Sequence, residues 1–194
     1  MRTLTKITGV LASTGILLSI TFSPAMATTT TDDIESTVTG GSLTATALAP
    51  TMSGVTLNGT STQESTGESK EWTITDARGS GAAWSLSVAA TDFTSAAGSV
   101  DTTERTLPVG NLTITPRTVR VGDGADTATP STEVVEMTIA AQSLVYTAGD
   151  NKGTYTLTPG FSLAIPANAY RSNFVGAVDT AKNPYISTLT VTIA

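Results

Sequence analysis

Short runs in which hydrophobic and polar residues alternate recur along most of the chain. In the stretch AAWSLSVAATDF, residues 82–93, Trp84 falls in step with Leu86 and Val88, while serines take the intervening positions. Because successive side chains of a strand point to opposite faces, this pattern predicts a half-buried β-strand. Comparable runs lie at residues 43–49, 72–76, 112–116, 119–121, 135–139, 144–146, 161–165 and 185–193.

Beyond the N-terminal segment, no window repeats apolar residues at the spacing of an amphipathic helix. The alternating runs and the turn residues between them predict about eight or nine strands. The expected fold class is therefore all-β, an antiparallel β-sandwich of Greek-key or jelly-roll-like type with no substantial helix in the mature chain. A closed barrel is the alternative.

Two details of the pattern predict local geometry. The strands that contain Trp72 and Trp84 are expected to form a hairpin, because DARGSG between them supplies turn residues for a loop of about four to six residues. Further on, the hydrophobic positions Val135, Met137 and Ile139 give way to Leu144 and Tyr146, which have the opposite parity. This switch predicts a bulge or strand break near Gln142.

The first 27 residues have the pattern of a secretory signal peptide. Arg2 and Lys6 form a basic start, the apolar stretch that follows is short of the roughly 20 residues of a spanning helix, and Ala-Met-Ala fits cleavage before Thr28. A retained membrane anchor is the alternative. The expected organisation is a signal peptide over residues 1–27, a flexible segment over residues 28–41 and one domain over residues 42–194.

Charge and composition narrow the classes of partner. The chain has 10 Lys and Arg against 16 Asp and Glu, and removal of Arg2 and Lys6 leaves a balance of 8 − 16 = −8. Nucleic acid and anionic lipid need clustered basic residues, so neither is an expected partner, and no membrane insertion is expected after signal cleavage. Cysteine and histidine are absent, which removes thiol and imidazole catalysis and Cys/His zinc sites. We expect no cofactor and no enzymatic activity.

Four segments resemble, in order, the segments of one family. WTITDARGSGAAWSLSVAATDF is similar to the first signature of the WxL domain surface proteins, in which a strand ends in an Asp-x-Arg-Gly turn and the next opens with Trp-x-Leu. LVYTAGDNKGTYTL resembles the family's Gly-punctuated hairpin, and FSLAIPANAY its Leu-x-Val-Pro-Ala segment with Ile165 in the valine position. YISTLTVTI resembles the closing strand, with Val191 and Ile193 in place of the family's Trp and Leu.

The resemblance extends from about residue 42 to residue 194 and implies a function. It implies a secreted protein of Gram-positive type that associates non-covalently with the cell wall, through peptidoglycan, and that acts with other cell-surface proteins. A protein held at the cell surface by its wall contacts alone is therefore expected.

The aromatic residues are the main candidates for a site. We expect the motif positions Trp84, Leu86, Val191 and Ile193 to form structural core, because an indole buries roughly 150–250 Å² and would contribute much to stability. Trp72 lies near a strand start, where it is expected either in the core or half-exposed as a carbohydrate platform. With Trp72, the tyrosines Tyr170 and Tyr185 are the candidate contacts with glycan or partner.

Acidic residues give only weak candidates. Asp123 and Asp126 in GDGAD are candidate calcium ligands, as are Asp150 and Asn151 in GDNKG, but neither loop has EF-hand spacing, so solvated turns are favoured. A carboxylate pair for glycoside hydrolysis cannot be singled out among the 16 acidic residues.

The sequence thus favours a secreted, non-catalytic protein of the cell surface that binds peptidoglycan. The main alternative is a structural or interaction subunit of a surface complex or filament that binds another protein, because its long Thr-rich strands offer edges for strand addition. A free secreted carbohydrate-binding module is the third possibility.

Overall fold

The computed structural model describes residues 32–194, and the predicted signal peptide lies outside the described residues. One compact unit comprises Val38–Ala194. Its regular structure is almost entirely β, with a single 3-10 turn at Val109–Asn111 and no α-helix among residues 32–194. None of the described residues forms a helix with the length and apolar character needed to cross a membrane.

The all-β prediction is confirmed, with more strands than the eight or nine expected. The strands are β1 (Leu43–Thr46), β2 (Gln63–Glu68), β3 (Trp72–Asp76), β4 (Ser85–Ala90), β5 (Phe93–Ser95), β6 (Arg105–Leu107), β7 (Leu112–Thr115), β8 (Arg120–Val121), β9 (Ser131–Thr132), β10 (Val135–Glu136), β11 (Gln142–Tyr146), β12 (Gly153–Leu157), β13 (Gly160–Ile165) and β14 (Leu189–Ile193). All strand pairs are antiparallel.

Short breaks within long strands explain why there are more strands than expected. β12 and β13 are separated by two residues, and their neighbours β3 and β2 are separated by three. β3 pairs with β12 and β2 with β13 in registers that differ by one residue, so the four strands form one long antiparallel ladder with an irregularity in its middle. The buried Pro159 lies at that irregularity, and its carbonyl accepts a hydrogen bond from the Ser69 backbone N–H at 3.1 Å. Proline has no N–H for a ladder, so a break is expected there.

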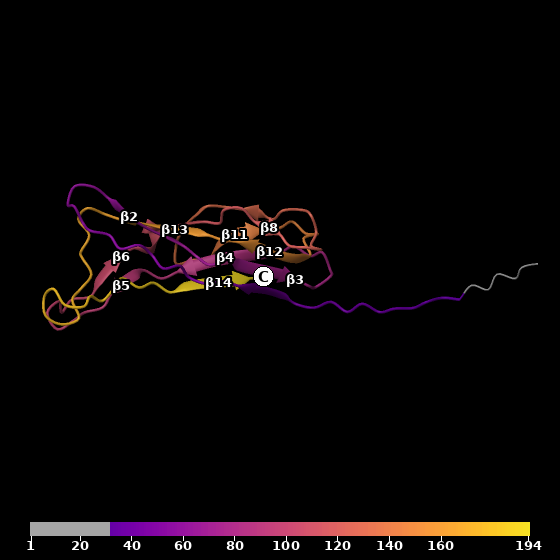
Figure 1. The fold of residues 1–194 in the computed structure, drawn as a ribbon, viewed down its shortest axis with the longest axis horizontal. Coiled ribbons are helices and arrows are strands. Elements are labelled where there is room, and N and C mark those ends of the chain that lie inside the picture. Colours follow the sequence, from indigo (N-terminus) through magenta and orange to yellow (C-terminus); the bar gives the residue numbers. More distant parts are fainter. Residues whose placement is uncertain (1–31) are drawn as a thin grey trace, which may run out of the picture. The chain divides into compact units, whose positions relative to one another are not determined.

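The strands form two layers. The long ladder belongs to two sheets, β1-β3-β12-β8 and β10-β7-β13-β2. A third sheet, β14-β4-β11-β9, forms the other layer, and the hairpin β5-β6 extends it, because β4 leads directly into β5. Figure 1 shows β5 and β6 at the opposite end of this unit from β3 and β8.

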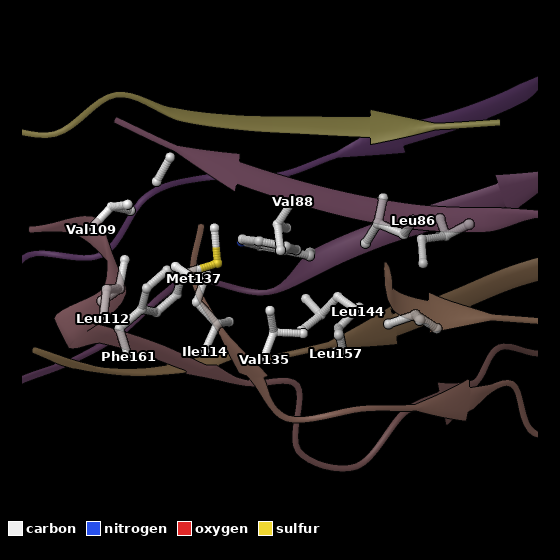
Figure 2. Close-up of a cluster of buried hydrophobic side chains, with 14 of the residues drawn as sticks. Leu86, Val88, Val109, Leu112, Ile114, Val135, Met137, Leu144, Leu157 and Phe161 are labelled. Carbon is white, nitrogen blue, oxygen red and sulfur yellow. The ribbon is translucent and has the colours of Figure 1, made fainter. Parts of the chain in front are cut away.

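The core lies between the layers. Leu86 and Val88 of β4 and Leu144 of β11, its neighbour in the same sheet, project into the core toward Leu157 of β12 in the facing layer (Figure 2). These four side chains are at most 2% exposed. Burial of one such aliphatic side chain contributes about 1.5–3 kcal/mol, so the alternating positions recognised in the sequence supply much of the stability of the sandwich.

Two expectations of local structure are corrected. β3 and β4 do not form a hairpin: β3 lies between β1 and β12, and β4 lies between β14 and β11. Ile139 and Tyr146 were expected to face the core, but they are 80% and 41% exposed. The irregularity expected near Gln142 is present, since the pairing of β11 with β4 shifts register between Ser143 and Val145.

Candidate functional site

The signature tryptophan Trp84 is enclosed immediately before β4. It is 2% exposed, its indole N–H donates to the carbonyl oxygen of Asn151 at 3.1 Å, and its ring centroid lies 5.9 Å from that of Tyr155. Asn151 in turn donates from its amide to the carbonyl of Ala128 at 2.6 Å. Trp84 therefore joins three segments of the fold and presents almost no ring surface to a ligand.

The Asp-x-Arg turn of the signature carries the chain from one layer to the other. Asp76 has a fully buried carboxylate, which accepts hydrogen bonds from Arg78 Nε at 3.0 Å and Nη2 at 2.9 Å. Arg78 Nη2 also donates to the carbonyl of Ala82 at 2.8 Å. The side-chain hydrogen bond from Arg78 is the main reason that the pKa of Asp76 is lowered. The charged pair thus fixes the turn that ends β3 and leads to Trp84.

The other motif positions also belong to the core or its margin. Trp72 is completely buried and donates its indole N–H to the carbonyl of Leu48 at 2.9 Å, so its ring is not exposed as a carbohydrate platform. Leu86 is completely buried as well, whereas Val191 and Ile193 are half-buried and pack against the core cluster from the edge strand β14.

The acidic loops lie at this same end. Asp126 forms an ion pair with Lys152 at 2.7 Å and accepts the backbone N–H of Lys152 at 2.7 Å. The hydrogen bond from the Lys152 side chain is the main cause of the lowered pKa of Asp126. Asp123 is exposed. Among residues 32–194, no three acidic side chains come together as a metal site would require.

A groove lies at the other end of the unit, beside the β5-β6 hairpin. Its volume is about 550 Å³, and it is bounded by residues 52–57, by the end of β13 and by the segment from Tyr170 to Tyr185. Phe93, Leu107 and Leu163 line it with buried apolar side chains. The groove brings together Tyr170 and Tyr185, two of the residues predicted from the sequence as candidate contacts with glycan or a protein partner.

Tyrosine and arginine side chains pack against one another at this groove. Tyr185 donates its hydroxyl to the carbonyl of Tyr170 at 3.0 Å, and burial raises the pKa of that hydroxyl. Tyr170 is 62% exposed, and the guanidinium carbon of Arg105 lies 3.8 Å from the centre of its ring. A guanidinium at this distance stacks favourably on an aromatic face.

The segment that borders the groove is held by buried polar groups. The Asn173 amide donates to the carbonyls of Ser95, Ala96 and Thr103 at 3.3, 3.1 and 2.8 Å. Asp101 pairs with Arg171 at 2.7 Å and accepts the backbone N–H of Phe174 at 2.8 Å.

The pKa of Asp101 is lowered, chiefly by its hydrogen bond with Arg171. Close packing adds to this support, because a Cβ on Gly98 would collide with the carbonyl oxygen of Phe174. The groove is consequently a preformed feature and not a loosely held loop.

A second hollow, of about 430 Å³, lies over the junction of the long ladder. Its cation, Arg117, is already paired with Glu68 at 2.7 Å, and both side chains are about half exposed. Exposed ion pairs of this kind contribute little to stability. The hollow has Phe161 as its aromatic residue, and that side chain is 5% exposed. It is therefore a weaker candidate than the groove.

Sequence reasoning missed most of the groove. Met52, Leu57 and Lys182 line it, but they come from segments without any recognisable motif. Arg105 was missed as well, although it stacks on Tyr170. An alternating pattern identifies which side chains of a strand are buried, and it contains no signal for which distant loops meet.

Comparison with known proteins agrees with the fold and with the signature. The model of the WxL domain family, described as surface cell wall-binding, matches residues 17–193, nearly the whole chain. No curated protein and no solved structure matches. The chain therefore belongs to the WxL domain family of cell wall-binding proteins of the cell surface.

Proposed function

We propose that this chain is secreted after removal of residues 1–27, carries a flexible segment ahead of the compact unit that begins at Val38, and binds peptidoglycan non-covalently and without catalysis. The groove at Tyr170 and Tyr185 carries the proposal, because it combines exposed aromatic surface, apolar lining and cationic side chains in a preformed hollow. Concave, mostly apolar sites with a few polar groups are the usual form of a ligand site. Membership of a cell wall-binding family supports the cell wall as the place where this chain binds.

The test is sedimentation of the secreted protein with purified peptidoglycan, prepared with and without wall teichoic acids. Binding to both preparations supports the proposal. Failure to sediment with either preparation would refute wall binding through peptidoglycan. Sedimentation only with the preparation that retains teichoic acids would show that the protein binds teichoic acid and not peptidoglycan. A dye-release assay on the same walls should give no hydrolysis above buffer.

A protein partner is the second candidate, favoured by the position of β14. This strand is at the edge of its sheet, pairs with β4, and presents Thr190 and Thr192 to solvent. An edge strand can accept a strand from another chain. Size-exclusion chromatography and electron microscopy would show a complex or filament if this candidate is right, and a monodisperse monomer if it is not.

A further inference from the structure

We propose that the groove recognises a carboxylate-bearing peptide, the stem peptide of peptidoglycan, and not the sugar backbone. This inference rests on the proposed function and adds the class of ligand and the residue that selects it. Three features of the groove carry it: its aromatic rings, its charge and its rigidity.

The aromatic rings form no broad platform for sugar. Sugar rings stack on broad exposed aromatic faces, but both tryptophans of the chain are buried. Tyr170 is exposed, but Arg105 covers one face of its ring, and Tyr185 is only partly exposed. The remaining apolar lining is mostly aliphatic, with Met52, Val55 and Leu57 as a half-buried wall. Such a lining matches the methyl groups and aliphatic side chains of a short peptide.

The charge of the groove is opposite to that of the chain. Acidic residues outnumber basic ones by 16 to 10, yet the charged residues that line the groove within residues 32–194 are Arg171 and Lys182, and none is acidic. Arg171 already shares its charge with Asp101. Lys182 takes part in none of the ion pairs formed among residues 32–194. Arg105 lies against the ring of Tyr170 and is not part of the lining, so Lys182 is the cation of the described lining that is available to a carboxylate.

The backbone of Lys182 is held in place before any ligand arrives. Its backbone forms a β-bridge with Phe174, and the next residue, Asn183, donates its backbone N–H to the carbonyl of Asn173 at 2.8 Å. The Asn183 side chain donates to the carbonyl of Ala96 at 2.9 Å. A fixed backbone lowers the entropy lost on binding, which favours recognition of a small charged group.

The presence of one available cation in the described lining also argues against the phosphate chain of a teichoic acid. Affinity for a polyanion comes from many basic contacts, and the acidic balance of the chain opposes its approach. One carboxylate on a largely aliphatic peptide needs only one cation and an apolar wall. The groove supplies both.

The experiment compares stem peptides, released from peptidoglycan by an amidase, with the peptide-free glycan strands. Each is titrated into the secreted protein by calorimetry. Binding is expected for the stem peptides, with Lys182→Gln weakening it about tenfold, the usual scale of one charge-assisted hydrogen bond. Stem peptides whose carboxylates are converted to amides should show a similar loss. Lys70→Gln is the matched control, because Lys70 is exposed, lies outside the groove and loses the same charge.

The outcomes separate this inference from the proposed function. Binding to glycan strands but not to stem peptides would overturn the peptide proposal and leave peptidoglycan binding intact. Equal affinities for Lys182→Gln and Lys70→Gln would show that the groove is not the site. Sedimentation with no form of peptidoglycan would refute the proposed function itself.

Discussion

The indole N–H of Trp84 donates to the carbonyl oxygen of Asn151, across 67 residues of sequence, at 3.1 Å. The bond joins the start of β4 to the loop before β12, and so ties the two layers together beside the Asp76 turn. The residue that gives the family its signature is thus part of a structural junction. The groove lies at the far end of β4, which leads into the β5-β6 hairpin.

Trp84→Ala should lower the free energy of unfolding by about 3–5 kcal/mol, because it removes a buried aromatic side chain and leaves a cavity. Trp84→Phe should lose less, since it keeps most of the apolar contact and gives up the bond to Asn151. Urea denaturation of both variants measures the difference. If Trp84→Ala unfolded at the same urea concentration as wild type, the enclosed position of the indole would be contradicted.

Asp76→Ala should destabilise the protein, because the Arg78 guanidinium loses its partner and the turn between layers loses three hydrogen bonds. Breaking a largely buried ion pair is costly, and we expect a fall in Tm of about 5–10 °C for a domain of this size. Differential scanning calorimetry tests this. Asp123→Ala, at an exposed loop position, is the control and should leave Tm within about 1 °C of wild type.

Stability should fall in acid. Hydrogen bonds from Arg78, Arg171 and Lys152 lower the pKa values of Asp76, Asp101 and Asp126. A carboxylate whose pKa is lower when folded stabilises the native state at pH values above its unfolded pKa of about 3.9. That contribution disappears as the pH falls from there through the lowered native values.

Thermal denaturation between pH 7 and pH 2 should therefore show a steep decrease in Tm below about pH 4. The decrease should be shallower in Asp76→Asn, which cannot titrate at that position. Parallel curves for this variant and wild type would argue that Asp76 does not contribute to the acid sensitivity.

Asn173→Ala should affect both stability and binding. Three carbonyls lose their donor, and unsatisfied buried polar groups cost about 1–3 kcal/mol each when no water replaces the bond. Because Asn173 supports the segment that carries Lys182, affinity for peptidoglycan should also fall. Sedimentation measured well below the variant's Tm separates the loss of groove shape from global unfolding.

The paired positions Val88 and Val191 should differ in their sensitivity to truncation. They face one another in the β4-β14 ladder, but Val88 is completely buried whereas Val191 is half-buried at the sheet edge. Val88→Ala should cost about 2 kcal/mol and Val191→Ala about 1 kcal/mol or less, in proportion to the area removed from water. Equal losses in chemical denaturation would contradict the edge position of β14.

For most strands, the residues that face the core could be predicted from sequence. The strand with which each one pairs could not. Leu86, Val88 and Leu163 all face the core as the alternation predicts. The hairpin of β3 with β4, expected from the DARGSG turn between two alternating strands, is wrong. A period of two reveals which face of a strand is buried and not which strand pairs with it. The DARGSG turn changes layers because Asp76 is buried and bound by Arg78, a contact that has no periodic signature.

The candidate site was predictable only in part. Tyr170 and Tyr185 could be nominated as aromatic residues near the end of the chain, and the structure brings them to one groove. Trp72 could be nominated on the same grounds but is buried against Phe161, with ring centroids 6.3 Å apart. Lys182 became a candidate because none of the described residues that line the groove is acidic. That property depends on packing and not on the sequence neighbours of Lys182.

The backbone of Ala194 exchanges both hydrogen bonds with Ser85, at 2.8 and 3.1 Å, and the Gly41 N–H donates to the carbonyl of Ala77 at 2.7 Å. Residue 194 and the first residues of the compact unit are thereby fixed beside the Trp84 junction, away from the β5-β6 hairpin (Figure 1). An affinity tag or fluorophore joined after Ala194 would accordingly leave the groove unobstructed. Immobilisation on a sensor surface through that residue would turn the groove toward the injected stem peptides.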